Sequence, residues 1–134
     1  MNQERNARGF TLIELMIVVV IMALLATIAI PNFISMQDRA KEAKVKGAAH
    51  TVQLAAEDFA VRNDGLYSDQ AADLTPLFPG AALLEHPFTG AATEPQFGAA
   101  ANATGTTGIL AIQQAGVNVG YTITGVGKTA GQVI

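Results

Sequence analysis

The stretch GFTLIELMIVVVIMALLATIAIP, from Gly9 to Pro31, decides how this chain folds. Between Phe10 and Ile30 it carries a single charge, Glu14, and shows no polar face at the 3.6-residue spacing of a soluble amphipathic helix. At a rise of 1.5 Å per residue this helix is about 31 Å long, close to the hydrocarbon thickness of a bilayer. The stretch therefore predicts a helix that lies in lipid, or in a bundle of helices that replaces lipid.

Glu14 is the unusual residue of this helix. On insertion scales a charged side chain costs about 2.5–3.5 kcal/mol at the centre of a membrane helix and less near an interface. Its place near the start of the apolar run is consistent with an interfacial carboxylate, which the helix dipole favours in the first turn. An ionisable residue in a membrane helix is also a candidate functional residue. Residue chemistry alone leaves both interpretations open.

The residues that precede and include this carboxylate, RGFTLIE from Arg8 to Glu14, resemble the processing signature of type IV prepilins and related pseudopilins. In that family a prepilin peptidase cleaves after the glycine, here Gly9, and the new terminal residue, here Phe10, is N-methylated. The resemblance implies that Glu14 guides subunit assembly. The resemblance extends through the apolar segment to Pro31, where such subunits commonly carry a helix-distorting proline. Beyond about residue 62 the chain resembles the family only in its expected architecture.

A physical argument supports this role for Glu14. Cleavage after Gly9 frees an α-amine on Phe10, which is charged or nearly so at neutral pH. The Glu14 carboxylate of a neighbouring subunit would neutralise that amine in the low-dielectric core of a filament. Because a buried charge without its partner is costly, the pair would set the register between subunits rather than add much net stability.

The first nine residues are polar and contain Arg5 and Arg8. An ordinary secretory signal loses its apolar region on cleavage, whereas here the apolar run follows the cleavage site and is retained. The two arginines predict a cytoplasmic N-terminus by the positive-inside rule. We therefore expect a leader peptide at residues 1–9, a transmembrane and filament-core helix at 10–30, and an exported head at 31–134.

Composition limits both what the head is expected to bind and what can stabilise its fold. The 134 residues carry a net charge of −3, which does not indicate nucleic acid as a partner. A group of basic residues on one helix is interpreted as a solvated face: Arg39, Lys41, Lys44 and Lys46. The chain has no cysteine, so the disulfide that closes a C-terminal loop in many exported pilins cannot form. Packing alone must hold the head together.

The helix is expected to continue from Phe10 to about Arg62. Pro31 lacks an N–H and is predicted to kink the helix or melt it locally. Gly65 is suited to a left-handed C-terminal cap. Gly47 lies in the helix interior, where glycine lowers helix stability. It marks either a close contact with another element or a tolerated local loss of stability. The exported half has an apolar stripe of mostly small residues: Val45, Ala48, Ala49, Val52, Ala55, Ala56 and Phe59.

The remainder of the chain predicts an α+β head. A short helix is expected near Gln70–Leu77, and residues 99–108 are expected to form an exposed loop. Apolar clusters at Leu74, Leu77–Phe78, Leu83–Leu84 and Phe88 are expected to pin this region onto the helix. Period-two alternation and β-branched runs predict three strands that form a small antiparallel sheet against the long helix: Gly108–Ile112, Val117–Thr124 and Gln132–Ile134.

No enzyme signature, cofactor motif or metal motif is present in the sequence. His50 is interpreted as a helix-face residue and His86 as a loop residue. The major pseudopilin of type II secretion carries a calcium loop near its C-terminus, but this chain has no Asp or Glu after Glu94, so a carboxylate-rich site there is excluded. Asn102 fits a glycosylation acceptor pattern, but its turn-rich surroundings favour an asparagine that is present for its backbone preferences.

The resemblance implies a structural subunit of a type IV pilus-like filament, held in the inner membrane and then assembled with copies of itself. It further implies a prepilin peptidase/methyltransferase, an assembly ATPase and a platform membrane protein as partners. Adhesion, surface motility and DNA uptake are activities that such a fibre serves. Two alternatives remain: a pseudopilin of a type II secretion system, whose short fibre is periplasmic, and a single-span envelope protein with a binding head.

Overall fold

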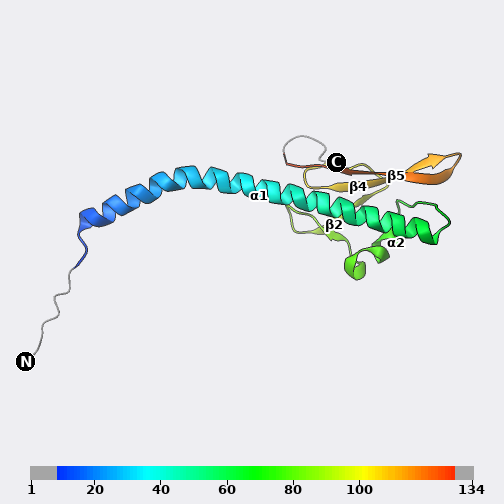
Figure 1. Ribbon diagram of the computed structural model, residues 1–134, viewed down its shortest axis with the longest axis horizontal. Helices are drawn as coiled ribbons and strands as arrows, with labels where there is room; N and C mark the ends of the chain where they lie inside the picture. Colours follow the sequence, from blue (N-terminus) through cyan, green and yellow to red (C-terminus); the bar gives the residue numbers. More distant parts are fainter. Residues whose placement is uncertain (1–8, 129–134) are drawn as a thin grey trace, which may run out of the picture. The chain divides into compact units, whose positions relative to one another are not determined.

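The structure is a computed structural model that describes residues 9–128 (Figure 1). The chain divides into two compact units after Met36. The elements are, in chain order, α1 (Leu12–Arg62), α2 (Ala71–Leu74), the 3-10 turns η1 (Thr75–Leu77) and η2 (Pro79–Ala81), β1 (Leu84–Glu85), β2 (Ala92–Glu94), β3 (Gln96–Phe97), β4 (Thr107–Gln114) and β5 (Val117–Gly125).

The first unit contains the N-terminal part of α1. The helix begins at Leu12, two residues later than predicted, because Thr11 acts as its N-terminal cap. Helical structure continues through Pro31, so the predicted local melting does not occur there, and the predicted kink stays a prediction. The large apolar side chains of this part are all exposed within the chain.

The second unit contains the rest of α1, whose buried face confirms the predicted apolar stripe. The buried side chains recur every three or four residues: Val45, Ala49, Val52, Ala55, Ala56 and Ala60. Four of these six are alanines, and their small size allows the strands to approach the helix closely. The helix ends at Arg62 as predicted, and Gly65, at a φ of 82°, donates its N–H to the Ala60 carbonyl as a left-handed cap.

The strands of the second unit form a three-stranded sheet in the order β3-β4-β5 and a separate antiparallel pair, β1-β2. β4 and β5 contain the predicted strands Gly108–Ile112 and Val117–Thr124 and pair antiparallel as a long hairpin. Its turn residues, Ala115 and Gly116, both have positive φ, as in a type I′ turn. β3 was not predicted, and it pairs with β4 in parallel. Strands of two or three residues are too short to show a period-two pattern, so no local pattern indicates β1, β2 or β3.

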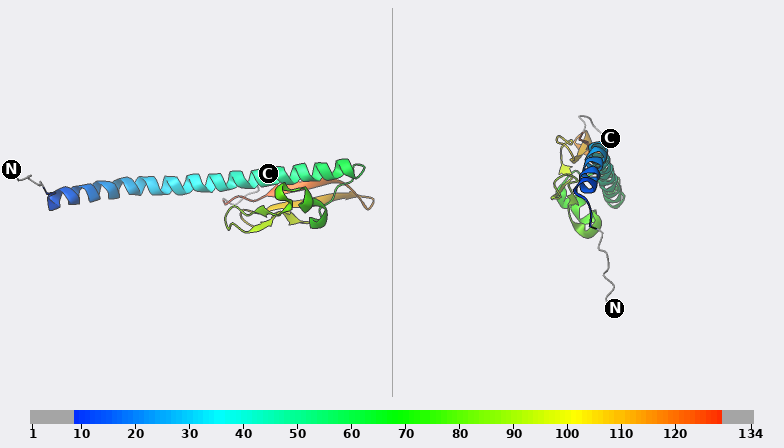
Figure 2. Two further views of the ribbon diagram at one scale, coloured as in Figure 1. Left: turned by 90° about the horizontal axis from the view of Figure 1, so that it is seen from below. Right: turned by 90° about the vertical axis from the view of Figure 1, so that its left-hand side faces the viewer.

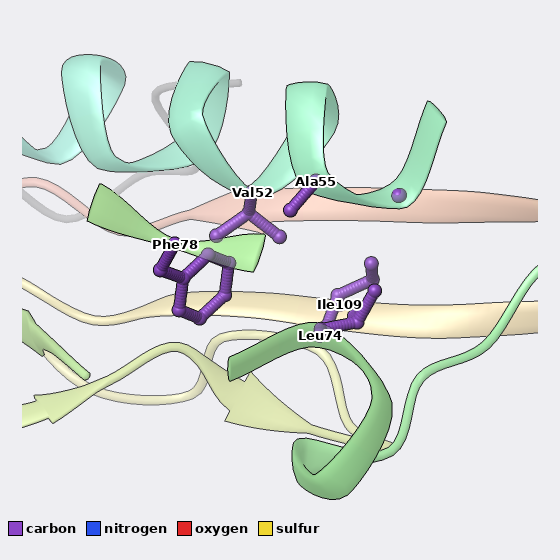
Figure 3. Packing of buried hydrophobic residues seen from close by; sticks show 6 residues of the cluster. Val52, Ala55, Leu74, Phe78 and Ile109 are labelled. Atoms are coloured by element: carbon purple, nitrogen blue, oxygen red, sulfur yellow. The ribbon is translucent and has the colours of Figure 1, made fainter. Parts of the chain in front are cut away.

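One hydrophobic core joins the helix to the strands (Figure 3). Val52 and Ala55 of α1 face Ile109 of β4, while Leu74 of α2 and Phe78 approach from the opposite side. The predicted pinning by Leu74 and Phe78 is confirmed, since both are buried. Figure 2 shows α2 and the strands gathered along one side of this part of α1. The prediction of a short helix near Gln70–Leu77 is confirmed by α2 and η1.

One loop differs from its predicted environment. Residues 99–106 form the expected connection, but β4 begins at Thr107, and Gly105 and Thr106 are buried rather than exposed. Gly105 lies against His86 and Phe88 of the segment after β1, a contact that the local composition does not reveal. The predicted strand Gln132–Ile134 lies outside the described residues.

Candidate functional site

The predicted cleavage site lies in accessible, non-helical backbone. Gly9 and Phe10 precede the first residue of α1, and both are exposed, with 90% of the Phe10 surface free. A peptidase requires backbone that is not held in helical hydrogen bonds, and exposed segments of this kind are where chains are cut. The geometry at Gly9–Phe10 therefore fits a processing site.

Glu14 is held at the helix start by reciprocal hydrogen bonds with Thr11. The Thr11 backbone N–H donates to Glu14 Oε2 at 2.9 Å, and the Thr11 hydroxyl donates to the same oxygen at 2.8 Å. The Glu14 backbone N–H lies 3.3 Å from Thr11 Oγ1. This arrangement is a capping box, in which two backbone N–H groups that the helix leaves unpaired are satisfied.

Sequence reasoning identified Glu14 but missed Thr11. The signal was present, because Thr-x-x-Glu directly before an apolar run is the sequence pattern of a capping box. Among residues 9–128 both hydrogen bonds that the Glu14 carboxylate accepts end on Oε2. Oε1 is therefore available to a donor from another chain.

The site continues into an apolar surface that nothing in the described chain covers. α1 is long and apolar enough to cross a membrane. Its most apolar 18-residue window has a mean hydropathy of 2.9, and none of this window is buried within the chain. The polar hydroxyl of Thr27 donates to the Leu24 carbonyl at 2.7 Å, so it presents little polarity to the surroundings. Such a surface requires lipid or other helices against it.

A cluster of one carboxylate and two phenols fastens β5 to α1. The Tyr121 hydroxyl donates to Glu57 Oε1 at 2.6 Å, and the Tyr67 hydroxyl donates to Oε2 at 3.3 Å. The two rings lie 5.1 Å apart between centroids. Partial burial, together with the hydrogen bond and charge of Glu57, raises the pKa of Tyr121 to about 12. Partial desolvation and the Glu57 charge also raise the pKa of Tyr67. The arrangement keeps both phenols protonated, which suits a structural clamp.

His86, a predicted loop residue, connects two loops of the head. It is buried, its Nδ1 accepts the backbone N–H groups of Phe88 and Thr89, and its Nε2 lies 3.1 Å from the Thr104 carbonyl oxygen. The ring therefore needs its proton on Nε2, with Nδ1 as acceptor. This pattern fixes the turn after β1 against the loop before β4. His50 is exposed on α1, as predicted.

The remaining candidate is a shallow groove between α1 and β5. Its volume is about 340 Å³, and its lining residues are Lys46, Ala49, His50, Gln53, Tyr121 and Ile123. They do not include a nucleophile with an adjacent base. Between residues 9 and 128 there is also no group of three or more metal-ligating side chains.

Comparison with known proteins relates the processing site and the helix to a family. Residues 5–30 match the model of the prokaryotic N-terminal methylation motif. The chain is 49% identical over 67 residues to the type IV major pilin protein PilA of Myxococcus xanthus, covering 50% of this chain and 30% of that protein. It is 41% identical over 68 residues to the type IV wide pilus major component PilA4 of Thermus thermophilus, covering 51% and 52%.

A third relative comes from a secretion system. The type II secretion system core protein G of Pseudomonas aeruginosa is 38% identical over 68 residues, which is 51% of this chain and 48% of that protein. The chain thus spans about half the length, or less, of these relatives. No solved structure matches it. The chain therefore carries the prokaryotic N-terminal methylation motif at residues 5–30, and over about half of its length it is similar to type IV pilins and type II secretion pseudopilins.

Proposed function

We propose that this chain is a structural subunit of a type IV pilus-like filament, cleaved between Gly9 and Phe10 and assembled through α1. One observation carries the proposal: an uncovered apolar helix stands directly behind an accessible, non-helical Gly9–Phe10 bond. Cleavage there leaves the helix in the mature chain with a new terminus. A protein that is only anchored by a membrane helix would not require an accessible, cleavable bond directly before that helix.

The apolar part of α1 needs two successive environments. Before assembly the bilayer covers it, because its length and hydropathy suit a membrane span. In the filament the same surface packs against copies of itself. The proposed parts are the leader at 1–9, the span and filament-core helix at 10–30, and the exported head at 31–134. The subunit waits in the inner membrane with its N-terminus in the cytoplasm.

Glu14 and the new amine of Phe10 give the filament its register. The capping box leaves Oε1 of Glu14 available, and the N-methylated amine of a neighbouring subunit supplies the donor. Proposed partners are further copies of the chain, a prepilin peptidase/methyltransferase, an assembly ATPase and a platform membrane protein. The proposed role is structural, without a catalytic step of its own.

A pseudopilin of a type II secretion system is the second candidate. It is favoured by the relatives named as type II secretion system core protein G. The same helix and processing site would serve it, but its fibre would remain in the periplasm.

The test is to shear fibres from cells that produce the chain and to identify their main protein by mass spectrometry. We expect surface fibres made of a chain that begins at a methylated Phe10, and their loss on deletion of the gene. Loss of export of folded proteins, without surface fibres, would favour the pseudopilin. Monomeric protein in the envelope that still begins at Met1 would contradict both and favour a single-span binding protein.

A further inference from the structure

The hydroxyl of Thr11 accepts a backbone N–H that would otherwise extend α1 toward the proposed cleavage site. In an α-helix each N–H donates to the carbonyl four residues earlier, so one more residue of helix would require the Glu14 N–H to donate to the Phe10 carbonyl. The Glu14 N–H instead lies 3.3 Å from Thr11 Oγ1. The first bond of the helical pattern comes from the next residue, because the Leu15 N–H donates to the Thr11 carbonyl at 3.3 Å. The Thr11 hydroxyl and the Phe10 carbonyl are therefore alternative acceptors for one N–H group.

The Glu14 carboxylate holds the Thr11 hydroxyl in the orientation that this competition needs. The hydroxyl donates to Glu14 Oε2 at 2.8 Å, and the Thr11 N–H donates to the same oxygen at 2.9 Å. With its hydrogen directed at the carboxylate, Thr11 Oγ1 keeps its lone pairs for the Glu14 N–H. Together these hydrogen bonds fix Thr11 as the residue directly before Leu12, the first residue of α1.

The cap leaves the carbonyl groups around the proposed cleavage site without a partner in the described chain. Between residues 9 and 128 no hydrogen bond ends on the carbonyl of Gly9 or Phe10. Figure 1 shows the chain entering α1 through a short segment without helical turns. The Gly9 carbonyl is the group that a peptidase must attack. Two further residues of helix would occupy it, because the Ile13 N–H would then donate to it.

Without this cap, the start of α1 is expected to grow rather than to unwind. The first N–H groups of a helix have no intrahelical partner, and the apolar surroundings proposed for α1 supply little water to satisfy them. If the hydroxyl is absent, helical geometry offers the Phe10 carbonyl to the Glu14 N–H. The side chains of Leu12 and Ile13 are exposed, so packing within the chain does not fix the first helical residue. The Thr11 hydroxyl is what fixes it.

We propose that Thr11 is a positioning residue for removal of the leader. By capping α1 at Leu12 it keeps the Gly9–Phe10 bond in the non-helical form that the prepilin peptidase cleaves. This inference rests on the proposed function, because it concerns the same cleavage. It gives the Thr11 hydroxyl a role before assembly, whereas the role proposed for Glu14 concerns assembly of the cleaved chain.

Four substitutions at position 11 separate helix capping from the shape of the side chain. Thr11→Ser and Thr11→Asn keep an oxygen that caps a helix, Thr11→Val keeps the shape of threonine without an acceptor, and Thr11→Ala removes both. Mass spectrometry of the N-terminus over time measures the rate at which prepilin peptidase cleaves the full-length chain. We expect Thr11→Val and Thr11→Ala to slow cleavage by about 2- to 30-fold, the population change that corresponds to loss of an N-cap. Thr11→Ser and Thr11→Asn should be cleaved at nearly the wild-type rate.

Thr27→Val is the matched control. The Thr27 hydroxyl donates to the Leu24 carbonyl at 2.7 Å within α1 and does not cap the helix. The substitution removes the same chemical group from the same helix, so cleavage should keep its wild-type rate. Equal slowing in Thr27→Val and Thr11→Val would overturn the inference, because the position of the hydroxyl would then not matter.

The start of the helix is also measured directly. The uncleaved chain is labelled with carbon-13 at Phe10 and studied by nuclear magnetic resonance in detergent micelles. We expect the Cα chemical shift of Phe10 to be non-helical in the wild type and in Thr11→Asn, and to move toward the helical value in Thr11→Val. A non-helical shift in Thr11→Val would overturn the inference, because the helix would then not have grown.

The cleavage outcomes separate this inference from the function on which it rests. A wild-type chain that is not cleaved after Gly9 would overturn both. Normal cleavage of Thr11→Val beside a cleaved wild-type chain would overturn the inference alone. Slow cleavage of both Thr11→Asn and Thr11→Val would also overturn it alone, because the peptidase would then recognise the threonine side chain itself rather than the start of the helix.

Discussion

Glu14 can serve two partners with its two oxygens. Oε2 accepts hydrogen bonds from Thr11 within the same helix, while Oε1 remains for the amine of another subunit. The first interaction needs an acceptor oxygen, and a glutamine provides one as well. The second needs a negative charge. A substitution that removes the charge and keeps the oxygen therefore distinguishes helix capping from register.

We predict that Glu14→Gln and Glu14→Ala both impair fibre assembly, because both remove the charge that neutralises the Phe10 amine. Only Glu14→Ala should also loosen the first helical turn, because it removes the oxygen that accepts hydrogen bonds from Thr11. Fibre yield by shearing measures assembly, and mass spectrometry of the N-terminus measures cleavage after Gly9. Cleavage should persist in both variants. Normal fibres from Glu14→Gln would assign the role of Glu14 to capping instead.

Gly105 is required for both its conformation and its lack of a side chain. Its φ is +83°, and a Cβ there would lie 2.5 Å from Phe88 Cδ2 and 2.7 Å from His86 Cε1. Gly65 has nearly the same φ, +82°, with nothing within 4 Å, so it is a matched control. Gly65→Ala should cost about 1–2 kcal/mol from backbone strain alone. Gly105→Ala should cost about 1–3 kcal/mol more through overpacking. Chemical denaturation measures both, and equal losses would exclude a tight contact at Gly105.

The Tyr121 phenol should make stability depend on pH in the alkaline range. Its pKa is raised to about 12 in the folded chain, against about 10 when unfolded. Between these values the folded state keeps a proton that the unfolded state loses, so stability falls as the pH rises from about 10 to about 12. Below pH 10 the contribution is fully present. Tyr121→Phe should show a weaker decline, with some remaining because the pKa of Tyr67 is also raised. An unchanged decline in Tyr121→Phe would show that other groups cause it.

At the scale of elements, two neighbouring residues of β4 differ sharply in burial. Ile109 is fully buried beneath α1, and its neighbour Leu110 is 42% exposed on the other face. We predict that Ile109→Ala lowers the free energy of unfolding by about 2–5 kcal/mol. Leu110→Ala should cost less than about 1 kcal/mol, since a half-exposed side chain loses little burial. Denaturation of the two variants in detergent measures the difference. Similar losses would mean that the sheet faces α1 in another register.

The strength of the local pattern decided which elements could be predicted. The stripe from Val45 to Ala60 and the alternation in β5 span many residues, so their periodicity is clear. β3 contains two residues and forms only because Gln96 and Phe97 lie beside Gly108 and Ile109 of β4. His86 was expected in a loop, and its burial depends on the carbonyl of Thr104, eighteen residues away. Neither position carries a local signal.

At the scale of the whole molecule, the proposed function divides the chain into a membrane span and an acidic head. Before assembly the bilayer must accept the apolar half of α1. We predict that Val20→Lys, near the middle of the span, reduces membrane retention, because a central lysine costs about 2.5–3.5 kcal/mol on insertion. Thr122→Lys, on an exposed position of β5, adds the same charge outside the span and should have no such effect. Carbonate extraction of membranes measures retention. Equal extraction of both variants would contradict the assignment of the span.

The sequence by itself determined the long apolar helix and the buried stripe of α1, and it predicts the processing site at Gly9–Phe10 and the assembly role of Glu14. These are properties of contiguous residues, so hydropathy, a motif and a helical period reveal them. Only the tertiary structure decided the Glu57–Tyr121 clamp, the burial of His86 and the parallel pairing of β3. Each depends on which residues meet across long separations in the chain, and that is set by the packing of the core rather than by any local pattern.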